Sequence, residues 1–448
     1  MKKVRIGVLG AYRGTSMINY CKRADNAEVV AICDKSRYAL DSQRKMAEGL
    51  DITFYDNFED FIKHDMDAVI LANYAHQHAP FAIRAMKEGK HVFSEVLPVQ
   101  TMKEAVELVE AVEETGMTYA YGENYCYMPA PYEMKVQYKN GKIGELEYAE
   151  CEYIHNCESI WHSITYGEKD HWRNNMYSTF YCTHSLGPII HMTGLRPVKV
   201  TGFEGTQVER NLRKGSKSGS FGIEMVTMEN GAIVKSIHGG LYKDSIWYSA
   251  YGSKGRMECG REGVDEANGN IYDAESQNGH IYKLYIDSDE YSGGYETAKK
   301  ESYNPKRELD SKAEGFGHGC SDFYCMYHFV EKINGNPDAD IIDVYEALDM
   351  FLPGMFAFRS ILDGGTSKDI PNLRNIEERD IWRNDTACTD PEAAGDMLLP
   401  TFSLGTPEID DGVYDHMKEL WDRECAEGNS DYQKAAFSQG AKINKEEN

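Results

Sequence analysis

The sequence lacks the patterns of a secreted, metal-bound or membrane-spanning protein. Its eleven cysteines are scattered from Cys21 to Cys425 without a C-x-x-C pair, which indicates neither a disulfide framework nor a zinc site. No apolar run is long enough to cross a bilayer, and the short run that follows Met1 leads into a glycine turn instead of a signal peptide. We therefore expect a cytoplasmic protein without a membrane partner or a bound metal.

Positive charge is also scarce. The 448 residues include 48 Lys and Arg against 73 Asp and Glu, a formal charge of −25. A field of this sign repels phosphate backbones, so a nucleic-acid partner is excluded from our expectations. The hydrophobic share of 41% is that of a globular chain, and the length exceeds what one core usually organises, which predicts two domains.

What is present begins with a strand, a turn and a second strand. Val4 to Leu9 reads as a buried strand, residues 10–14 as a turn into a helix, and Glu28 to Cys33 as a strand that ends in Asp34. This spacing is typical of dinucleotide binding, with Asp34 accepting from a ribose diol. Tyr12 replaces the usual central glycine, so an ordinary loop is an alternative. The expected cofactor contacts are Gly10, Tyr12, Arg13, Gly14 and Asp34.

The alternation continues along the first part of the chain. Strands are predicted at 67–72 and 91–94, and helices at 80–88 and from the capping box at Thr101 to Gly116. Strands that alternate with helices form parallel, right-handed βαβ units. The fold class is therefore α/β, with a Rossmann dinucleotide-binding domain over residues 1–125.

The pattern then changes to strands in a row. Strand-like runs begin near Gly144 and recur at 198–203, 223–228, 232–237 and 245–251. They predict a second α/β domain, residues 126–365, with an open, largely antiparallel sheet. Helices are expected at 321–333 and after the capping box at Asp343. Residues 366–448 form an acidic extension that we expect to pack on the other domains, with an amphipathic helix marked by Val413, Met417, Leu420 and Trp421.

The stretch from His171 to Pro188 is the candidate active centre. Tyr181 and His184 are three residues apart and would share one face of a helix, an arrangement suited to relayed proton transfer. A buried structural Tyr and His satisfied by backbone groups is the competing interpretation.

Several motifs resemble the Gfo/Idh/MocA family of nicotinamide-dependent oxidoreductases. They are Gly89-Lys90-His91-Val92, the turn from Glu95 to Pro98, Gly141-Lys142-Ile143-Gly144-Glu145, Tyr251-Gly252-Ser253-Lys254-Gly255 and Asp343-Val344-Tyr345-Glu346-Ala347. The resemblance implies a Rossmann domain followed by an α/β domain whose sheet carries the substrate site and an oligomer contact. It also implies that Asn73, His78, Glu95 and Asn124 border the cofactor.

Within that family, one departure is informative. Sugar dehydrogenases carry Glu-Lys-Pro, but this turn reads Glu95-Val96-Leu97-Pro98 and lacks the lysine. The same absence, and segments such as Glu123-Asn124-Tyr125 and His318-Gly319, are similar to the NAD-dependent glycosidases of glycoside hydrolase family 109. In that branch the Tyr-x-Thr-His segment bears the catalytic pair, which maps onto Tyr181 and His184. Asn73-Tyr74, where Thr-Pro is usual, departs from the family pattern.

The resemblance predicts hydrolysis of a small-molecule or oligosaccharide glycoside through a transient redox cycle. The sugar is oxidised at C3, the C1 substituent is eliminated, water adds and the ketone is reduced again. Bases and a proton source are needed, with pKa values near the working pH. Tyr181 can act as a base only if a cation such as Arg173 or Lys90 lowers its pKa.

Six further residues are candidate substrate contacts: His155, His171, Trp172, Arg173, His318 and Asp322. Trp offers a stacking face and Arg a donor fork for sugar oxygens. The alternatives are a solvent-facing or backbone-bonded His155, a surface ion-pairing loop at 171–173, and a helix cap at 318–322. NAD is the expected cofactor because of Asp34, although Lys35 and Arg37 could accept the 2′-phosphate of NADP.

Two other functions are compatible with these residues. One is a plain NAD(P)-dependent sugar or polyol dehydrogenase, and the other is a non-catalytic, NAD-binding regulator that uses the acidic extension to bind a partner. No two carboxylates are singled out for ordinary glycosidase chemistry. Homo-oligomerisation is expected from the resemblance alone.

Overall fold

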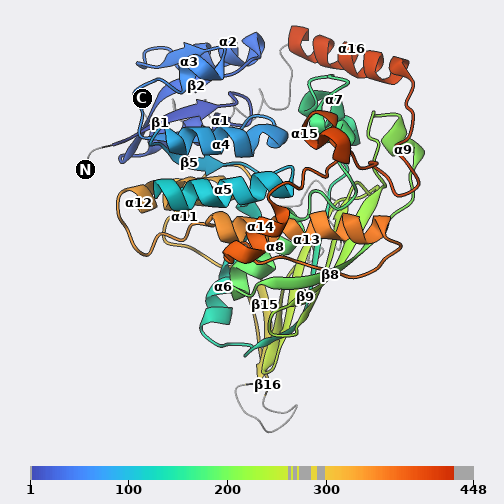
Figure 1. Cartoon of the computed structure of the whole chain (residues 1–448). Helices are drawn as coiled ribbons and strands as arrows, with labels where there is room; N and C mark the ends of the chain where they lie inside the picture. The colour runs from blue at the N-terminus through green and yellow to red at the C-terminus, as the bar shows by residue number, and fades with distance from the viewer. Residues whose placement is uncertain (1–2, 261–263, 266–269, 272–283, 290–297, 428–448) are drawn as a thin grey trace.

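The computed structural model describes residues 3–260, 264–265, 270–271, 284–289 and 298–427. Two sheets dominate it, one in the N-terminal part and a larger one in the C-terminal part, with helices packed on and between them (Figure 1). The α/β class, with a parallel Rossmann sheet followed by a mostly antiparallel one, is confirmed.

The first sheet has six parallel strands in the order β3-β2-β1-β4-β5-β6. Its central strands are nearly free of polar residues because helices cover both faces. The order reverses between β1 and β4, and the carboxyl ends beside such a switch point form a ligand crevice. The strands are β1 (Val4–Leu9), β2 (Ala27–Cys33), β3 (Thr53–Tyr55), β4 (Ala68–Leu71), β5 (His91–Ser94) and β6 (Tyr119–Tyr121).

The helices of this part follow the predicted signals with one shift. Thr101 and Glu104 form the expected capping box, and Gly116 ends that helix in the left-handed region. The helix expected from Pro80 begins two residues earlier, at His78, since proline is tolerated in a first turn. The helices are α1 (Thr15–Arg23), α2 (Arg37–Met46), α3 (Phe58–Phe61), α4 (His78–Lys87) and α5 (Met102–Thr115), with the short η1 (Ala75–Gln77) before α4.

The second sheet has nine strands in the order β16-β15-β12-β11-β7-β10-β9-β8-β17. All its neighbours are antiparallel except β7 and β10. The strands are β7 (Leu146–Ile154), β8 (Pro197–Glu204), β9 (Phe221–Met228), β10 (Ile233–Gly239), β11 (Ser245–Gly252), β12 (Gly255–Cys259), β15 (Leu284–Asp289), β16 (Ala298–Tyr303) and β17 (Lys368–Asp369), and β13 (Val264–Asp265) pairs with β14 (Asn270–Ile271).

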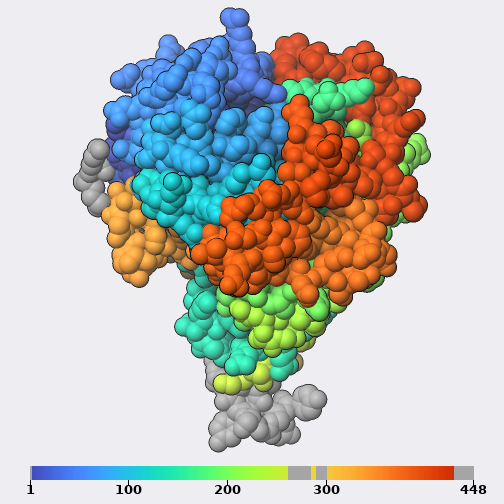
Figure 2. All heavy atoms as spheres, viewed as in Figure 1, coloured from blue at the N-terminus to red at the C-terminus, as the bar shows by residue number. Residues whose placement is uncertain are grey.

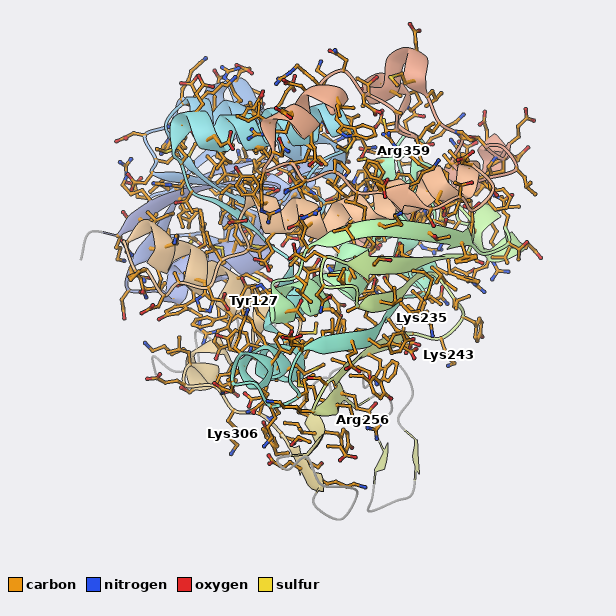
Figure 3. The ribbon with its side chains drawn as sticks, turned by 60° about the horizontal axis from the view of Figure 1, so that its bottom comes forward. Tyr127, Lys235, Lys243, Arg256, Lys306 and Arg359 are labelled. Atoms are coloured by element: carbon orange, nitrogen blue, oxygen red, sulfur yellow. The ribbon has the colours of Figure 1, made fainter. Side chains whose placement is uncertain are left out.

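One face of this sheet is covered by helices. Burial alternates along β9 and β10, as a half-covered sheet requires. The covering helices include α8 and α13, and Figure 3 shows Lys235 and Lys243 on the side away from Arg359 of α13. The helices of this part are α6 (Pro129–Lys139), α7 (Trp161–Ile164), α8 (Thr183–Thr193), α9 (Glu209–Leu212), α11 (Asp310–Ala313), α12 (Ser321–Ile333) and α13 (Val344–Leu362), with η2 (Asn124–Tyr127), η3 (Glu158–Ile160) and η4 (Trp172–Asn175).

The chain after α13 returns across the molecule to the N-terminal part. Its elements are α14 (Ile376–Trp382), α15 (Pro391–Ala394), η6 (Gly395–Met397) and α16 (Asp411–Glu427). α14 packs on α5, and the surface of this segment runs without a break from the second sheet to the Rossmann part (Figure 2). α16 buries Tyr414, Met417 and Trp421, the amphipathic face predicted in part from the sequence.

Two absences concern the described residues alone. None of the helices within them is both long and apolar enough to span a membrane. Within the same ranges, no three His, Cys, Asp or Glu side chains are grouped to hold a metal ion.

Two arginines of the C-terminal segment bind neighbouring glutamates of α5. Arg379 is 3% exposed and donates to both oxygens of Glu113 at 2.7 and 2.8 Å. Arg383, on the next turn, forms the same fork with Glu110, but its side chain is 42% exposed. The two pairs differ in burial more than in geometry.

We expect Arg379→Met to reduce the free energy of unfolding by about 2 kcal/mol, because it removes charged hydrogen bonds from a buried site. The measurement is chemical denaturation followed by circular dichroism. Arg383→Met is the matched control and should change stability less, since exposed pairs contribute little. Equal losses in the two variants would contradict the assignment of Arg379 as the buried clamp.

Candidate functional site

Two cavities lie at the carboxyl ends of the Rossmann strands. The first, which we call the Rossmann cavity, has a volume of about 460 Å³ and is lined by Gly10, Asp34, Asn73, Tyr166 and Trp421, among others. The second, the sheet pocket, has a volume of about 310 Å³ and lies between these loops and the second sheet. Both lie where ligands bind in open α/β sheets.

The glycine turn approaches the next strand closely. Gly10 has φ +97°, and a Cβ there would lie 2.3 Å from the carbonyl of Ala72. The amide of Gly14 donates to the carbonyl of Gly10 at 2.9 Å, and α1 begins at the next residue. Both positions therefore require glycine, although no third glycine is present. Tyr12 turns its ring away from the turn, toward Tyr166 and Trp421.

Asp34 stands at the end of β2, as expected. Its carboxylate accepts from the amides of Ala11 and Ser36, each at 2.7 Å. Burial raises the pKa of this carboxyl, and the two amides offset part of the effect. Asp34 thus lines the Rossmann cavity beside Lys35, the residue that could accept a 2′-phosphate. Arg37, the other such residue, has a largely exposed side chain.

Lys35 is engaged by an acid from the second part of the chain. Its ammonium lies 3.2 Å from Glu168 and 4.1 Å from the ring centre of Tyr74. The hydroxyl of Tyr74 donates to the same Glu168 at 2.7 Å. The acid therefore neutralises the cation that a 2′-phosphate would need.

An aromatic cluster closes the Rossmann cavity from outside the Rossmann sheet. Trp421 of α16 lies with its ring centre 6.2 Å from Tyr12, 6.1 Å from Tyr38 and 5.4 Å from Tyr166. Edge-to-face contacts of this kind are favourable. The C-terminal segment therefore supplies part of the cavity wall.

A charged network lies along the Rossmann side of the sheet pocket. Arg13 forms a fork with Asp322, with both distances 3.1 Å, and lies 2.7 Å from Glu95. Asn124 and His318 also donate to or contact Asp322, at 2.9 and 3.2 Å. Burial opposes ionisation of Asp322, but Arg13 and His318 outweigh it and hold its pKa well below the usual range. All but Asp322 line the sheet pocket.

His78, expected at the cofactor, lies behind this network. Its ring nitrogens contact the carbonyls of Leu97 and Asn73 at 2.9 and 3.3 Å, and it lines neither cavity. Burial lowers its pKa to about 4, so the ring is neutral at physiological pH. The expectation of direct contact is corrected: His78 ties the Glu95 turn to the Asn73 loop.

His184 faces the sheet pocket and is fixed from behind. Its Nδ1 lies 2.6 Å from Oε1 of Glu123, whose side chain is wholly buried. A carboxylate on Nδ1 sets the tautomer and orientation of an imidazole and leaves Nε2 for a substrate. The ring lies among Tyr125, Tyr153 and Tyr181, with centroid distances of 4.3, 4.7 and 5.0 Å.

The turn before α8 is held against α13, close to the proline inside that helix. Pro353 interrupts the hydrogen bonds of α13, and residues of the turn take up nearby carbonyls. Thr179 donates to Gly354 at 2.7 Å, and the thiol of Cys182 donates to Met350 at 3.3 Å. Gly354 is needed there, because a Cβ would lie 2.1 Å from the carbonyl of Thr179. Tyr181 and His184 lie within two residues of Cys182, so the contacts of Thr179 and Cys182 with α13 also position these two side chains.

Tyr181 precedes α8 instead of sharing a helical face with His184, but the two rings still meet. Burial raises the pKa of Tyr181, and Arg173, which hydrogen-bonds the phenol, offsets only part of this effect. The condition under which Tyr181 could act as a base, a phenol pKa lowered by a cation, is therefore not met. Lys90 precedes β5 at the amino end of the Rossmann strands, lines neither cavity and is not among the groups that shift the pKa of Tyr181.

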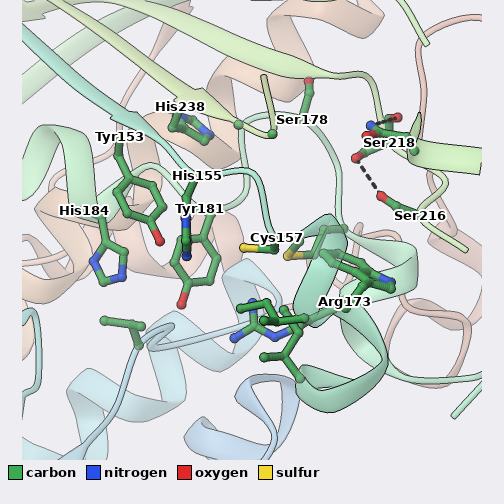
Figure 4. A pocket seen from close by; sticks show the side chains of 18 of the residues that line it. Tyr153, His155, Cys157, Arg173, Ser178, Tyr181, His184, Ser216, Ser218 and His238 are labelled. Carbon is green, nitrogen blue, oxygen red and sulfur yellow. Dashed lines mark hydrogen bonds between the residues drawn. The ribbon is translucent and has the colours of Figure 1, made fainter. Parts of the chain in front are cut away.

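His155 also reaches the sheet pocket. Its Nδ1 lies 2.9 Å from Asp244, and its ring hydrogen-bonds the thiol of Cys157. Burial favours the neutral ring, but these two partners raise the pKa of His155 to about 10. His155 is therefore a cation at neutral pH. Figure 4 shows it between Tyr181 and Cys157.

Besides Asp322, two more of the expected substrate contacts do not line the sheet pocket. Trp172 is buried against Phe180 and is covered by Arg173, 4.4 Å from its ring. His171 is buried, accepts from the amide of Arg173 and has its ring 4.6 Å from Tyr74. Neither lines the sheet pocket or the Rossmann cavity, so the expected sugar contact is corrected for both: they are core residues beside Arg173, which does line the sheet pocket.

Other lining residues were not expected. Lys214 and Tyr153 line the sheet pocket and Trp421 the Rossmann cavity, while Glu123 lies directly behind His184. The Glu123 motif was noted only as part of a resemblance. Nothing local in the sequence distinguishes Lys214 from the neighbouring Lys217.

Comparisons with known proteins agree with this architecture. Residues 4–123 match a family described as "Oxidoreductase family, NAD-binding Rossmann fold", and residues 252–377 match "Glycosyl hydrolase 109, C-terminal domain". A glycosyl hydrolase family 109 protein of Solibacter usitatus is 26% identical over 83% of this chain and 88% of its own length. Another from Shewanella amazonensis is 23% identical over 86% and 88%.

The N-terminal part of the chain thus matches the Gfo/Idh/MocA oxidoreductase family, and the C-terminal part matches glycosyl hydrolase family 109, to which the two relatives also belong. Among solved structures of this fold, myo-inositol 2-dehydrogenase from Lactobacillus plantarum has a TM-score of 0.61, with 17% identity over 82% of this chain and 100% of that one. These matches confirm an enzyme, a glycosidase or oxidoreductase with an NAD-binding Rossmann fold, and so disfavour the non-catalytic regulator.

We expect Trp421→Ala to weaken binding of NAD about tenfold, because it removes an aromatic wall of the Rossmann cavity. The measurement is calorimetric titration of nucleotide-free protein. Trp382→Ala is the matched control, since Trp382 packs on Phe356 and lines neither cavity. Unchanged affinity in Trp421→Ala would remove α16 from the cofactor site.

Proposed function

We propose that this enzyme is an NAD-dependent glycosidase. The sugar is transiently oxidised at C3, the leaving group is eliminated across C1 and C2, water adds, and the ketone is reduced again. The observation that carries the proposal is the Glu123–His184 pair beside Tyr181, on the wall of a pocket whose Glu95 turn has no lysine. Acid-base work at the sugar then falls to His184 and Tyr181.

The residues present fit the cofactor. Only glycine permits the close turn at Gly10, and the cavity beyond it ends at the carboxylate of Asp34. Gly10, Asp34 and Asn73 would hold NAD, with Glu95 and Asn124 bordering its nicotinamide. Bound NAD supplies a reversible acceptor of hydride. The ion pair between Lys35 and Glu168 supports NAD over NADP.

His184 is the proposed base. Glu123 holds Nδ1, so Nε2 can take a proton from the substrate and return it, while the buried carboxylate stabilises the charged ring. A carbon acid next to a ketone needs such a group within hydrogen-bond reach.

Tyr181 is the proposed proton donor to the leaving group. Its raised pKa keeps the phenol protonated at neutral pH, which suits an acid better than a base. Arg173 donates to the phenol oxygen and would stabilise the phenolate formed when the proton leaves. Homo-oligomerisation and a cytoplasmic location stay predictions.

A turnover experiment separates this proposal from a plain sugar dehydrogenase. A panel of aryl α- and β-glycosides is incubated in D₂O, with the bound cofactor identified by mass. We expect aglycone release without net accumulation of reduced cofactor, and deuterium at C2 of the released sugar. Reduced cofactor formed in step with product would establish the dehydrogenase instead.

We expect Glu123→Gln to lower kcat about 10²-fold, because the imidazole loses its anionic partner while the shape is kept. Initial rates of aglycone release measure this. Glu346→Gln is a matched control, since Glu346 binds the buried His191 at 2.6 Å, away from both cavities. Equal losses of activity in both variants, or none in Glu123→Gln, would contradict the assigned role.

A further inference from the structure

The sheet pocket extends well past the proposed acid-base pair. Tyr153, Tyr181 and His184 gather at one end, and Ser216 and Ser218 lie at the other (Figure 4). The far end is formed by the loop that carries Lys214 and by Trp161 of α7. A sugar at His184 therefore leaves room for a further group of the substrate.

The charge of this pocket is opposite to that of the protein. Three lining side chains, Arg13, Arg173 and Lys214, are Lys or Arg, and only Glu95 is an acid, whereas acids outnumber bases 73 to 48 in the whole chain. Arg13 is neutralised by Glu95 and Asp322. His155, a further cation, is paired with Asp244, and Arg173 hydrogen-bonds the Tyr181 phenol, so Lys214 is the cation to consider.

Lys214 is a buried cation in this pocket. It is 5% exposed, and its ammonium lies 4.3 Å from the centre of the Trp161 ring. Burial lowers its pKa. Among the described residues, no carboxylate oxygen lies within 4.0 Å of this ammonium. A buried ammonium without an anion is costly, so such a site is suited to a ligand that brings one.

The neighbouring groups do not supply a carboxylate for Lys214. Glu158, whose charge acts on Lys214 from a distance, is bound to Arg213 at 2.6 Å. Cys157 lies near Lys214, Arg173 and His155, and these cations lower the pKa of its half-buried thiol. Serine hydroxyls also line the pocket. Those of Ser216 and Ser218 lie 3.3 Å apart, and the buried hydroxyl of Ser178 has no hydrogen-bond partner among the described residues.

We propose that the far end of the sheet pocket binds a negatively charged oxygen substituent of the substrate, with Lys214 as its principal partner and Arg173, Ser216 and Ser218 around it. The substrate is then an acidic glycoside that carries a carboxylate, a sulfate ester or a phosphate ester. This inference rests on the proposed function for its reaction, but not for the binding of the anion. Ammonium and hydroxyl donors match all three groups.

The first test compares substrates that differ in one group. Aryl glucosides, glucuronides, 6-sulfates and 6-phosphates, each as both anomers, are given to the NAD-loaded enzyme. We expect one acidic class to exceed its neutral counterpart by about tenfold or more in kcat/KM. Lys214→Met should abolish that preference, chiefly through KM. Lys217→Met is the matched control, since Lys217 lies on the same loop, binds Asn175 and is not in the pocket.

The second test needs no turnover. Glucuronate, glucose 6-sulfate, glucose 6-phosphate and glucose are titrated into the NAD-loaded enzyme at constant ionic strength. We expect an acidic sugar to bind at least about tenfold tighter than glucose, and the difference to vanish in Lys214→Met but not in Lys217→Met. Equal binding of glucose and all three acids would overturn the proposal, even if aglycone release is observed. Preferential binding without aglycone release would instead contradict only the glycosidase.

Discussion

The site depends on one buried contact, the 2.6 Å pairing of Glu123 with His184. Glu123 follows β6, the last Rossmann strand, and His184 lies in the first turn of α8, which packs on the second sheet. A wholly buried carboxylate must have a partner, so the pair couples the position of α8 to the loop that would border the nicotinamide. Gly187, one turn later, keeps this contact close, because a Cβ there would lie 3.1 Å from Glu123.

Contacts around the Rossmann cavity also join the Rossmann part to later segments of the chain. Glu168 reaches Lys35 and Tyr74, and Trp421 reaches Tyr12 and Tyr38. The cofactor cavity is therefore completed by segments that are distant in the chain: Glu168 is 94 residues from Tyr74 and 133 from Lys35. In physical terms, a bound dinucleotide would stabilise the docking of the C-terminal segment, and that docking would in turn slow release of the dinucleotide.

Local patterns predicted the fold well and the site only in part. The strands around Gly10 and Asp34 and the capping box at Thr101 follow from periodicity and turn chemistry, which act over a few residues. Whether a side chain faces a cavity depends on packing between distant segments. Trp172 and His171 have the residue types of a sugar site but are buried beneath Arg173, while Lys214, without any local signal, lies on the pocket wall.

Arg173 connects the two ends of the sheet pocket. It hydrogen-bonds the Tyr181 phenol, and its charge also acts on Cys157, which lies toward the far end of the pocket. An anion bound there would draw on the same positive charge that lowers the cost of a Tyr181 phenolate. An acidic group bound beside Arg173 would thus raise the pKa of the Tyr181 phenol. The same group bound to Lys214 would affect that pKa less. If Lys214 binds the anion at the far end of the pocket, the charge of Arg173 is left to stabilise the Tyr181 phenolate.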